Sequence, residues 1–196
     1  MTPAIRRRSF LLLTGAACLP GEAWALSGAE ARSLVDLLVA DINAVIASGK
    51  SEAEMIKDFE GIFDRYADVP IMARYALGAD ARSASAAQMK AFTEAFRTYI
   101  SAKYGRRFRE FIGGRIDVQG ESAIPRGVQV ETMANLRGQA PFRVDFHVSD
   151  ASGKALFFNI IIEGIDMLLS ERTEIGAMLD QRRGDLDRLI ADLRAL

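Results

Sequence analysis

Side chains that could carry out catalysis are sparse in this chain of 196 residues. The single histidine, His147, lies in a run of alternating polar and apolar residues, on the polar side together with Asp145. A metal site or a nucleophile–base pair would need a second histidine or a cysteine nearby, and the only cysteine, Cys18, is far away in the sequence. Neither a G-x-S-x-G elbow nor a phosphate-binding G-x-x-x-x-G-K-S/T loop is present. We therefore predict no catalytic residue, no metal ion and no cofactor, and interpret His147 as a solvated residue of a sheet.

The N-terminal segment has the three parts of a signal peptide in the expected order. Residues 6–8 are arginines, residues 10–19 form an uncharged, mostly apolar stretch, and Ala23-Trp24-Ala25 fits a small-x-small cleavage site. A helix that spans a bilayer needs roughly 20 apolar residues, so this stretch is too short to be a permanent anchor. We predict that residues 1–25 are a cleavable signal peptide and that residues 26–196 form the mature domain, which would function in the bacterial periplasm.

The export route stays open between two alternatives. The segment Arg7-Arg8-Ser9-Phe10-Leu11 fits the R-R-x-F-L core of a twin-arginine signal, although three arginines serve the general secretory route equally well. Cys18 invites a third interpretation as the acylated residue of a lipoprotein. Because Gly15 stands where a large aliphatic residue is then expected, we expect cleavage after Ala25 and no lipid anchor.

The composition of the predicted mature chain limits its partners. Removal of residues 1–25 takes away the only cysteine and the only tryptophan, and leaves 22 basic against 25 acidic side chains. Such a chain forms no disulfide, and its slight acidity without a basic stripe argues against nucleic acid as a partner. No remaining apolar run is long enough to cross a membrane, and the length suits one domain.

Helical periodicity dominates the first half of the mature chain. Apolar residues recur at spacings of three and four, and Ser51 with Glu54 forms a capping box at the start of the second helix. Pro70 suits the first turn of a short third helix. The predicted helices cover residues 29–47, 51–66, 70–77 and 85–112.

After the glycine pair at residues 113–114 the period changes to two. The predicted strands cover residues 116–119, 128–136, 142–148 and 155–162. The first three have one polar and one apolar face, whereas the fourth is apolar on both faces except at Asn159, which indicates a central or doubly covered strand. Helical spacing returns at residues 168–179 and 186–193. The predicted fold class is therefore α+β, with N-terminal helices, a four-stranded antiparallel sheet and C-terminal helices.

Aromatic residues are concentrated on the predicted inward faces. Those of the fourth helix, such as Phe92 and Phe96, would face Phe146 and Phe158 of the sheet. A solidly packed core and a hollow apolar cavity give the same sequence pattern, so both interpretations stay open at this point.

Several segments together resemble one protein family. Residues 68–78, D-V-P-I-M-A-R-Y-A-L-G, resemble the D-V-P-x-M-A-R-x-x-L-G segment of the MlaC proteins, also called the toluene-tolerance family. Residues 88–96 are similar to the family's Q-x-x-x-F-x-x-x-F helix, and Tyr99 and Tyr104 match the aromatic positions that follow. Residues 162–172 resemble the family's v-E-G-v-s-l-l-x-x-x-R. The order of these segments is kept over almost the whole mature chain, although Asn159 stands where the family has an aspartate.

The resemblance implies a periplasmic lipid carrier with an NTF2-like arrangement of sheet and helices around an apolar cavity. The cavity would hold phospholipid acyl chains, and the protein, a monomer, would shuttle lipid between an outer-membrane lipoprotein complex and an MCE-domain inner-membrane complex of an Mla-type ABC transport system. The expected lining residues are Met72, Tyr75, Phe92, Phe96, Tyr99, Tyr104, Phe108, Val130, Val144, Phe146, Phe158 and Ile160. Arg74 would either neutralise a lipid phosphate or pair with Asp68.

Three other functions stay open from the sequence. An apolar pocket recognises shape poorly, so the cargo could be another lipid such as a hopanoid. The same elements suit an NTF2-like enzyme or sensor, but those domains place titratable groups inside the cone, where this chain has almost none. A solidly packed adaptor without any cargo is the third alternative.

Overall fold

Helices and an antiparallel sheet alternate in blocks along the chain. The computed structural model describes residues 26–105 and 114–195, so the predicted signal peptide (residues 1–25) and Phe108 lie outside the described residues. The helices are α1 (Gly28–Ile46), α2 (Glu52–Tyr66), α3 (Val69–Leu77), α4 (Ala86–Gly105), α5 (Met167–Gln181) and α6 (Leu186–Arg194), with a 3-10 helix, η1 (Gly78–Arg82), after α3. The strands are β1 (Arg115–Ile124), β2 (Gly127–Asn135), β3 (Phe142–Ser149), β4 (Leu156–Ile162) and β5 (Ile165–Asp166). The α+β class is thus confirmed. Within the described ranges, no helix has the length and apolar character needed to cross a membrane.

The sheet is a meander in which each strand pairs antiparallel with the next, in the order β1-β2-β3-β4-β5. It has five strands, so the prediction of four was wrong. The fifth strand has only two residues and pairs Ile165 with Ile162. Glu163 and Gly164, which form the turn between them, both have positive φ, at 49° and 79°. A strand of two residues is too short to show alternation in the sequence, so the periodicity did not predict it.

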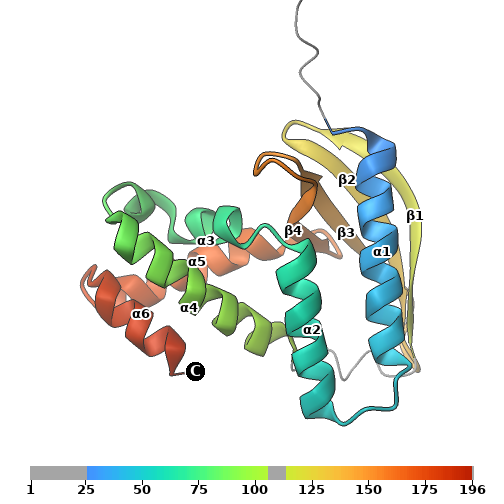
Figure 1. The fold of residues 1–196 in the computed structure, drawn as a ribbon, viewed down its shortest axis with the longest axis horizontal. Coiled ribbons are helices and arrows are strands. Elements are labelled where there is room, and N and C mark those ends of the chain that lie inside the picture. Colours follow the sequence, from blue (N-terminus) through green and yellow to red (C-terminus); the bar gives the residue numbers. More distant parts are fainter. Residues whose placement is uncertain (1–25, 106–113, 196) are drawn as a thin grey trace, which may run out of the picture.

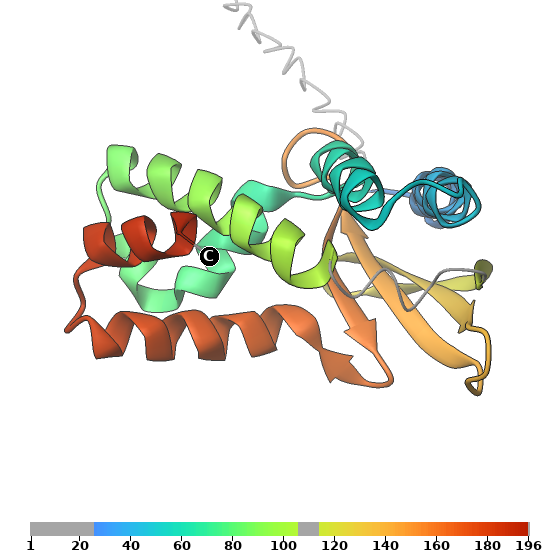
Figure 2. The same ribbon diagram turned by 90° about the horizontal axis from the view of Figure 1, so that it is seen from below.

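The helices form two groups around the sheet (Figures 1 and 2). Helix α1 packs along β1 and β2, with α2 beside it, while α3 and α5 contact β4. Helices α3 to α6 together form a block beside the β4 end of the sheet, which we call the helical block. Asn43 joins α1 to the edge strand, since its amide donates to the carbonyl of Ile116 and accepts from the Ile116 N–H, both at 3.0 Å.

Local sequence signals explain where the helices begin. The capping box predicted at Ser51 is confirmed, with the Glu54 N–H donating to Ser51 Oγ at 3.4 Å and the Ser51 N–H to Glu54 Oε2 at 3.0 Å. Ser27 starts α1 in the same way, and Ser85 with Gln88 starts α4. Each box satisfies backbone donors that a helix N-terminus leaves free.

The start of α3 is fixed by a fully buried carboxylate, Asp68. Its Oδ1 accepts from the Ile71 N–H at 3.2 Å, and its Oδ2 accepts from the hydroxyl of Ser152 in the turn between β3 and β4. Its backbone N–H donates to the carbonyl of Phe157 in β4 at 2.7 Å. We call these three contacts the Asp68 junction. The bond to Ile71 caps α3, and the bonds to Ser152 and Phe157 attach the helical block to the sheet.

We predict that replacing Gly127 with alanine destabilises the fold, whereas replacing Gly61 with alanine stabilises it. Gly127 has φ +144°, and an added Cβ would lie 2.0 Å from the carbonyl oxygen of Val148, so Gly127→Ala should lower the free energy of unfolding by about 3 kcal/mol. Gly61 lies inside α2 with open space around it, so Gly61→Ala should raise that free energy by about 0.5–1 kcal/mol. Urea denaturation of both variants measures the difference, and equal effects of the two changes would contradict this register of β2 against β3.

Candidate functional site

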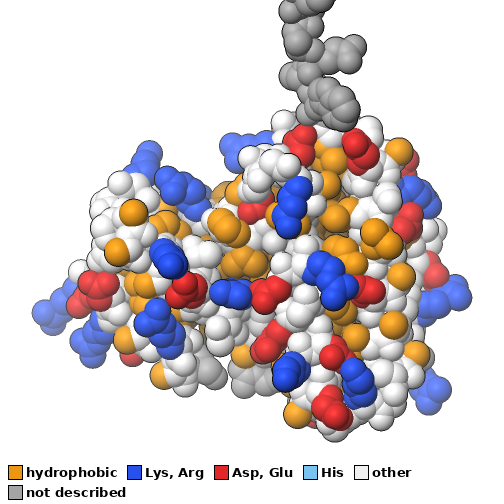
Figure 3. Space-filling model, viewed as in Figure 1, with side chains coloured by type: hydrophobic (Ala, Val, Ile, Leu, Met, Phe, Trp, Pro, Cys, Tyr) orange, Lys and Arg blue, Asp and Glu red, His pale blue; other side chains and the backbone are white. Residues whose placement is uncertain are grey.

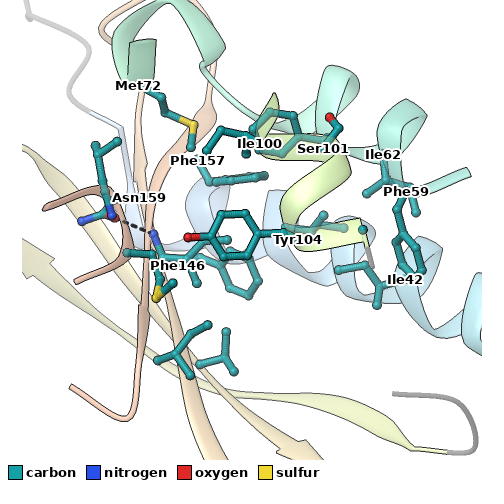
Figure 4. A pocket seen from close by; sticks show the side chains of 18 of the residues that line it. Ile42, Phe59, Ile62, Met72, Ile100, Ser101, Tyr104, Phe146, Phe157 and Asn159 are labelled. Atoms are coloured by element: carbon teal, nitrogen blue, oxygen red, sulfur yellow. Dashed lines mark hydrogen bonds between the residues drawn. The ribbon is translucent and has the colours of Figure 1, made fainter. Parts of the chain in front are cut away.

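An apolar cavity of about 170 Å³ lies between the sheet and the helices (Figure 4). The helices line it with Leu38, Ile42, Phe59, Ile62, Phe63, Met72, Ile100, Ser101, Tyr104, Gly105, Met167, Leu168 and Glu171, and the strands with Ile116, Val144, Phe146, Phe157, Asn159, Ile160 and Ile162. Among these described lining residues, only Ser101, Tyr104, Asn159 and Glu171 have polar side-chain atoms. The cavity therefore offers hydrocarbon surface on nearly all sides.

A bulge in β4 determines which aromatic ring reaches the cavity. His147 pairs with Asn159, but the next residue, Val148, pairs with Phe157, so Phe158 is an extra residue in β4. An extra residue reverses the alternation of side chains along a strand. Phe157 consequently lies on the same face as Phe146 and packs edge-on against it, with ring centroids 5.7 Å apart.

The structure brings five of the twelve predicted lining residues together in the cavity: Met72, Tyr104, Val144, Phe146 and Ile160. Four others are buried outside it: Phe92, Phe96, Tyr99 and Val130. Tyr75 and Phe158 line a different groove, and Phe108 lies outside the described residues. The fourth helix explains much of this difference, because α4 packs against α2, α3 and α6, and only its last turns reach the cavity.

The sequence interpretation left out the lining residues of α1 and α2, such as Ile42, Phe59 and Ile62. Their helical spacing marks them as buried, but it does not show which buried faces border an open space. Phe157 was missed because the bulge is invisible in a strand that is apolar on both faces. Glu171 was missed because a single carboxylate in a helix gives no sign of burial.

Polar side chains gather where α4 meets α5, and we call the five of them the polar cluster. It consists of Tyr99, Lys103, Tyr104, Glu171 and Glu174. Lys103 Nζ donates to Glu171 Oε1 at 2.8 Å and to Glu174 Oε2 at 2.5 Å. The Tyr99 hydroxyl donates to Glu174 Oε1 at 2.7 Å, and the Tyr104 hydroxyl donates to Glu171 Oε1. The cluster extends from solvent, where Glu174 is 49% exposed, to the cavity wall, where Glu171 is 3% exposed.

Burial and hydrogen bonding shift the pKa of Tyr99, Lys103, Tyr104 and Glu174 in the polar cluster. Burial, reinforced by the neighbouring carboxylates, raises the pKa of the Tyr99 and Tyr104 hydroxyls, so both stay donors. Burial acts to lower the pKa of Lys103, but its bonds to Glu171 and Glu174 outweigh this and raise it. The bond from Lys103 lowers the pKa of Glu174 below its ordinary value of 4.5.

A wider groove of about 1180 Å³ contains His147. His147 is half-buried rather than fully solvated, with Nε2 3.1 Å from Oε1 of its cross-strand neighbour Gln129 and its ring beside that of Phe158. Burial lowers the pKa of His147 below 6.5, against the opposite effect of Asp166 and Asp145. In residues 26–105 and 114–195 no cluster of three or more histidine, cysteine or acidic side chains could hold a metal ion.

The structure supports neither of the two alternatives for Arg74. The Asp68 carboxylate accepts hydrogen bonds from the Ile71 N–H and the Ser152 hydroxyl. Among the described residues, Asp68 and Arg74 form no ion pair with each other. Arg74 is exposed on α3, and it is not among the residues that line the cavity.

We predict that Glu174 makes the stability of the fold depend on acid pH. Because its pKa is lower in the folded than in the unfolded chain, its contribution is present at neutral pH and is lost as the pH falls below about 4.5. Urea denaturation at pH 7, 5, 4 and 3 should show a steeper loss of stability for the unmodified protein than for Glu174→Gln. Parallel pH profiles for the two proteins would contradict the Lys103–Glu174 contact.

Comparison with known proteins agrees with this architecture. The sequence matches the family model described as MlaC protein over residues 33–195. The fold is similar to that of the phospholipid-binding protein from Ralstonia solanacearum, solved in complex with a phospholipid, with a TM-score of 0.69. The two chains are 18% identical, and the match covers 84% of this chain and 98% of that one. At this identity the likeness supports the fold, whereas the family match extends over most of the sequence: the chain belongs to the MlaC family.

Proposed function

We propose that this protein is a phospholipid carrier that encloses acyl chains in the cavity between the sheet and the helices. The observation that carries this proposal is a cavity with a nearly complete hydrocarbon lining in a member of the MlaC family. The similarity to a phospholipid-binding protein solved with its lipid supports the same choice of ligand. A carrier needs no nucleophile or base, so we propose binding and transport rather than catalysis.

The energetics favour acyl chains as the ligand. Each methylene that leaves water contributes roughly 0.8 kcal/mol, so enclosing about ten methylenes contributes about 8 kcal/mol before the costs of binding. The rings of Phe146 and Phe157 and the branched side chains of Ile42 and Ile160 provide matching apolar contact. A lipid that cannot cross water at a useful rate could cross inside such an enclosure.

A whole acyl chain needs more room than the cavity has in this structure. About 170 Å³ is less than the roughly 300–1,000 Å³ of typical ligand pockets, so the walls must move apart when lipid enters. Met72 and Met167 line the cavity, and their unbranched side chains change shape at little cost. The helical block and the α1–α2 pair meet the sheet at different strands and touch each other where α2 packs on α4, so a shift at that contact would widen the cavity.

We further propose that the signal peptide (residues 1–25) directs the carrier to the periplasm. There the carrier would exchange lipid with an outer-membrane lipoprotein complex and an MCE-domain inner-membrane complex. On the face in Figure 3, basic and acidic side chains are interspersed, with no patch of one sign. Anionic membrane surfaces attract clusters of basic side chains, so this face of mixed charge favours docking to protein partners over direct membrane binding.

A matched pair of substitutions in β4 tests the cavity. Ile160 lines the cavity, whereas its neighbour Ile161 pairs with Asp145 on the opposite face of the sheet, and both are partly buried. Ile160→Asn places an amide that acyl chains would have to desolvate, so we expect lipid uptake at least about tenfold weaker, and we expect Ile161→Asn to retain uptake. Uptake is measured by incubating delipidated protein with phosphatidylethanolamine–phosphatidylglycerol vesicles and weighing the bound lipid by mass spectrometry.

Thermal unfolding of both variants provides the control for folding. A folded Ile160→Asn variant that takes up lipid as well as the Ile161→Asn variant does would show that the acyl chains lie elsewhere. If the protein takes up a hopanoid but no phospholipid in the same assay, the proposed ligand is wrong and the proposed binding cavity is kept.

A further inference from the structure

One carboxylate oxygen in the wall of the apolar cavity lacks a partner. Glu171 is 3% exposed and lines the cavity from α5. Its Oε1 accepts from both Lys103 and Tyr104, but its Oε2 is buried and has no hydrogen-bond partner among the described residues. A buried acceptor without a donor is costly and rare, and its presence beside a binding cavity calls for a ligand that supplies the donor.

The donors of the polar cluster are already directed to other oxygens. Lys103 is shared between Glu171 Oε1 and Glu174 Oε2, and the two tyrosine hydroxyls donate to Glu174 Oε1 and Glu171 Oε1. With one lysine against two glutamates, the cluster has an excess of one negative charge. The free oxygen therefore favours a donor that is also cationic.

The position of Glu171 suits the polar end of a lipid. In Figure 4, Ile42, Phe59 and Ile62 lie on the side of the cavity away from the Tyr104 hydroxyl, and all three side chains are hydrocarbon. At the α4–α5 end, by contrast, the partially exposed Lys103 and Glu174 connect the cavity wall to solvent. In Figure 4 the Tyr104 ring lies across the cavity with its hydroxyl directed away from α4. Acyl chains in the hydrocarbon end would leave the head group near Glu171.

We infer that Glu171 selects phospholipids with a primary ammonium head group, such as phosphatidylethanolamine, by accepting a hydrogen bond at Oε2. This inference rests on the proposed lipid-carrier function. A choline head group has the positive charge but no N–H to donate, and the phosphoglycerol head group has no cation to offset the excess negative charge. Glu171 thus sets head-group preference, while the apolar lining holds the chains.

Competition between three lipids tests this inference. Delipidated protein is mixed with equal amounts of phosphatidylethanolamine, phosphatidylcholine and phosphatidylglycerol that have identical acyl chains, and each bound lipid is counted by native mass spectrometry. The unmodified protein should prefer phosphatidylethanolamine over each of the others by about tenfold, the effect of one hydrogen bond to a charged group. Glu171→Gln should reduce this preference to about twofold or less, because phosphatidylethanolamine loses the acceptor that the other two lipids do not use.

Asp180→Asn is the matched control, since it removes an exposed carboxylate from the same helix, α5, away from the cavity. It should leave the preference unchanged. Equal binding of phosphatidylethanolamine and phosphatidylcholine by the unmodified protein would overturn the inference, even if Glu171→Gln fails to fold. Unchanged preference in a folded Glu171→Gln variant would overturn it as well. Failure to bind any of the three lipids would instead refute the carrier function on which it rests.

Discussion

The Asp68 junction holds the helical block against the sheet, and the cavity depends on that attachment. A fully buried carboxylate is tolerated only where its oxygens receive donors, and here the Ile71 N–H and the Ser152 hydroxyl supply them. The Asp68 N–H binds the carbonyl of Phe157, whose ring lines the cavity and packs against Phe63 and Phe146. The same short segment thus fixes the position of α3 and places an aromatic wall of the cavity. Loss of any one of these partners would leave a buried polar group without compensation.

The connection between β4 and α5 follows a similar principle. Asn159 accepts from the Leu168 N–H at 3.1 Å and donates to Asp166, and Asp166 in turn caps α5 through the Leu169 N–H at 2.8 Å. These bonds satisfy the polar groups at the β4–α5 connection, so the side chains of Met167 and Leu168 can line the cavity. Two buried carboxylate oxygens depart from this rule among the described residues, Asp145 Oδ1 and Glu171 Oε2, and Glu171 is the one of the two that lines the cavity.

Much of the fold could be predicted from the sequence, because its signals are local. Ser51 with Glu54 correctly predicted where α2 begins, and the alternation along β2 correctly predicted its buried side. In β3, by contrast, Asp145 on the predicted polar face is buried as well. The site was harder to predict, since its shape depends on packing between distant elements. Phe92 and Phe96 have the apolar spacing of a lining helix but are fully buried in α4, outside the cavity. Because Phe158 is an extra residue in β4, Phe157 rather than Phe158 lines the cavity. The apolar sequence of β4 shows no alternation from which this bulge could be predicted.

Native mass spectrometry tests the carrier function most directly. The mature protein, produced with its own leader and purified without detergent, is weighed intact and again after organic extraction. A carrier should release a stoichiometric phospholipid when it unfolds. A lipid-free mass that stays unchanged after incubation with phospholipid vesicles would contradict the proposal that this cavity carries acyl chains.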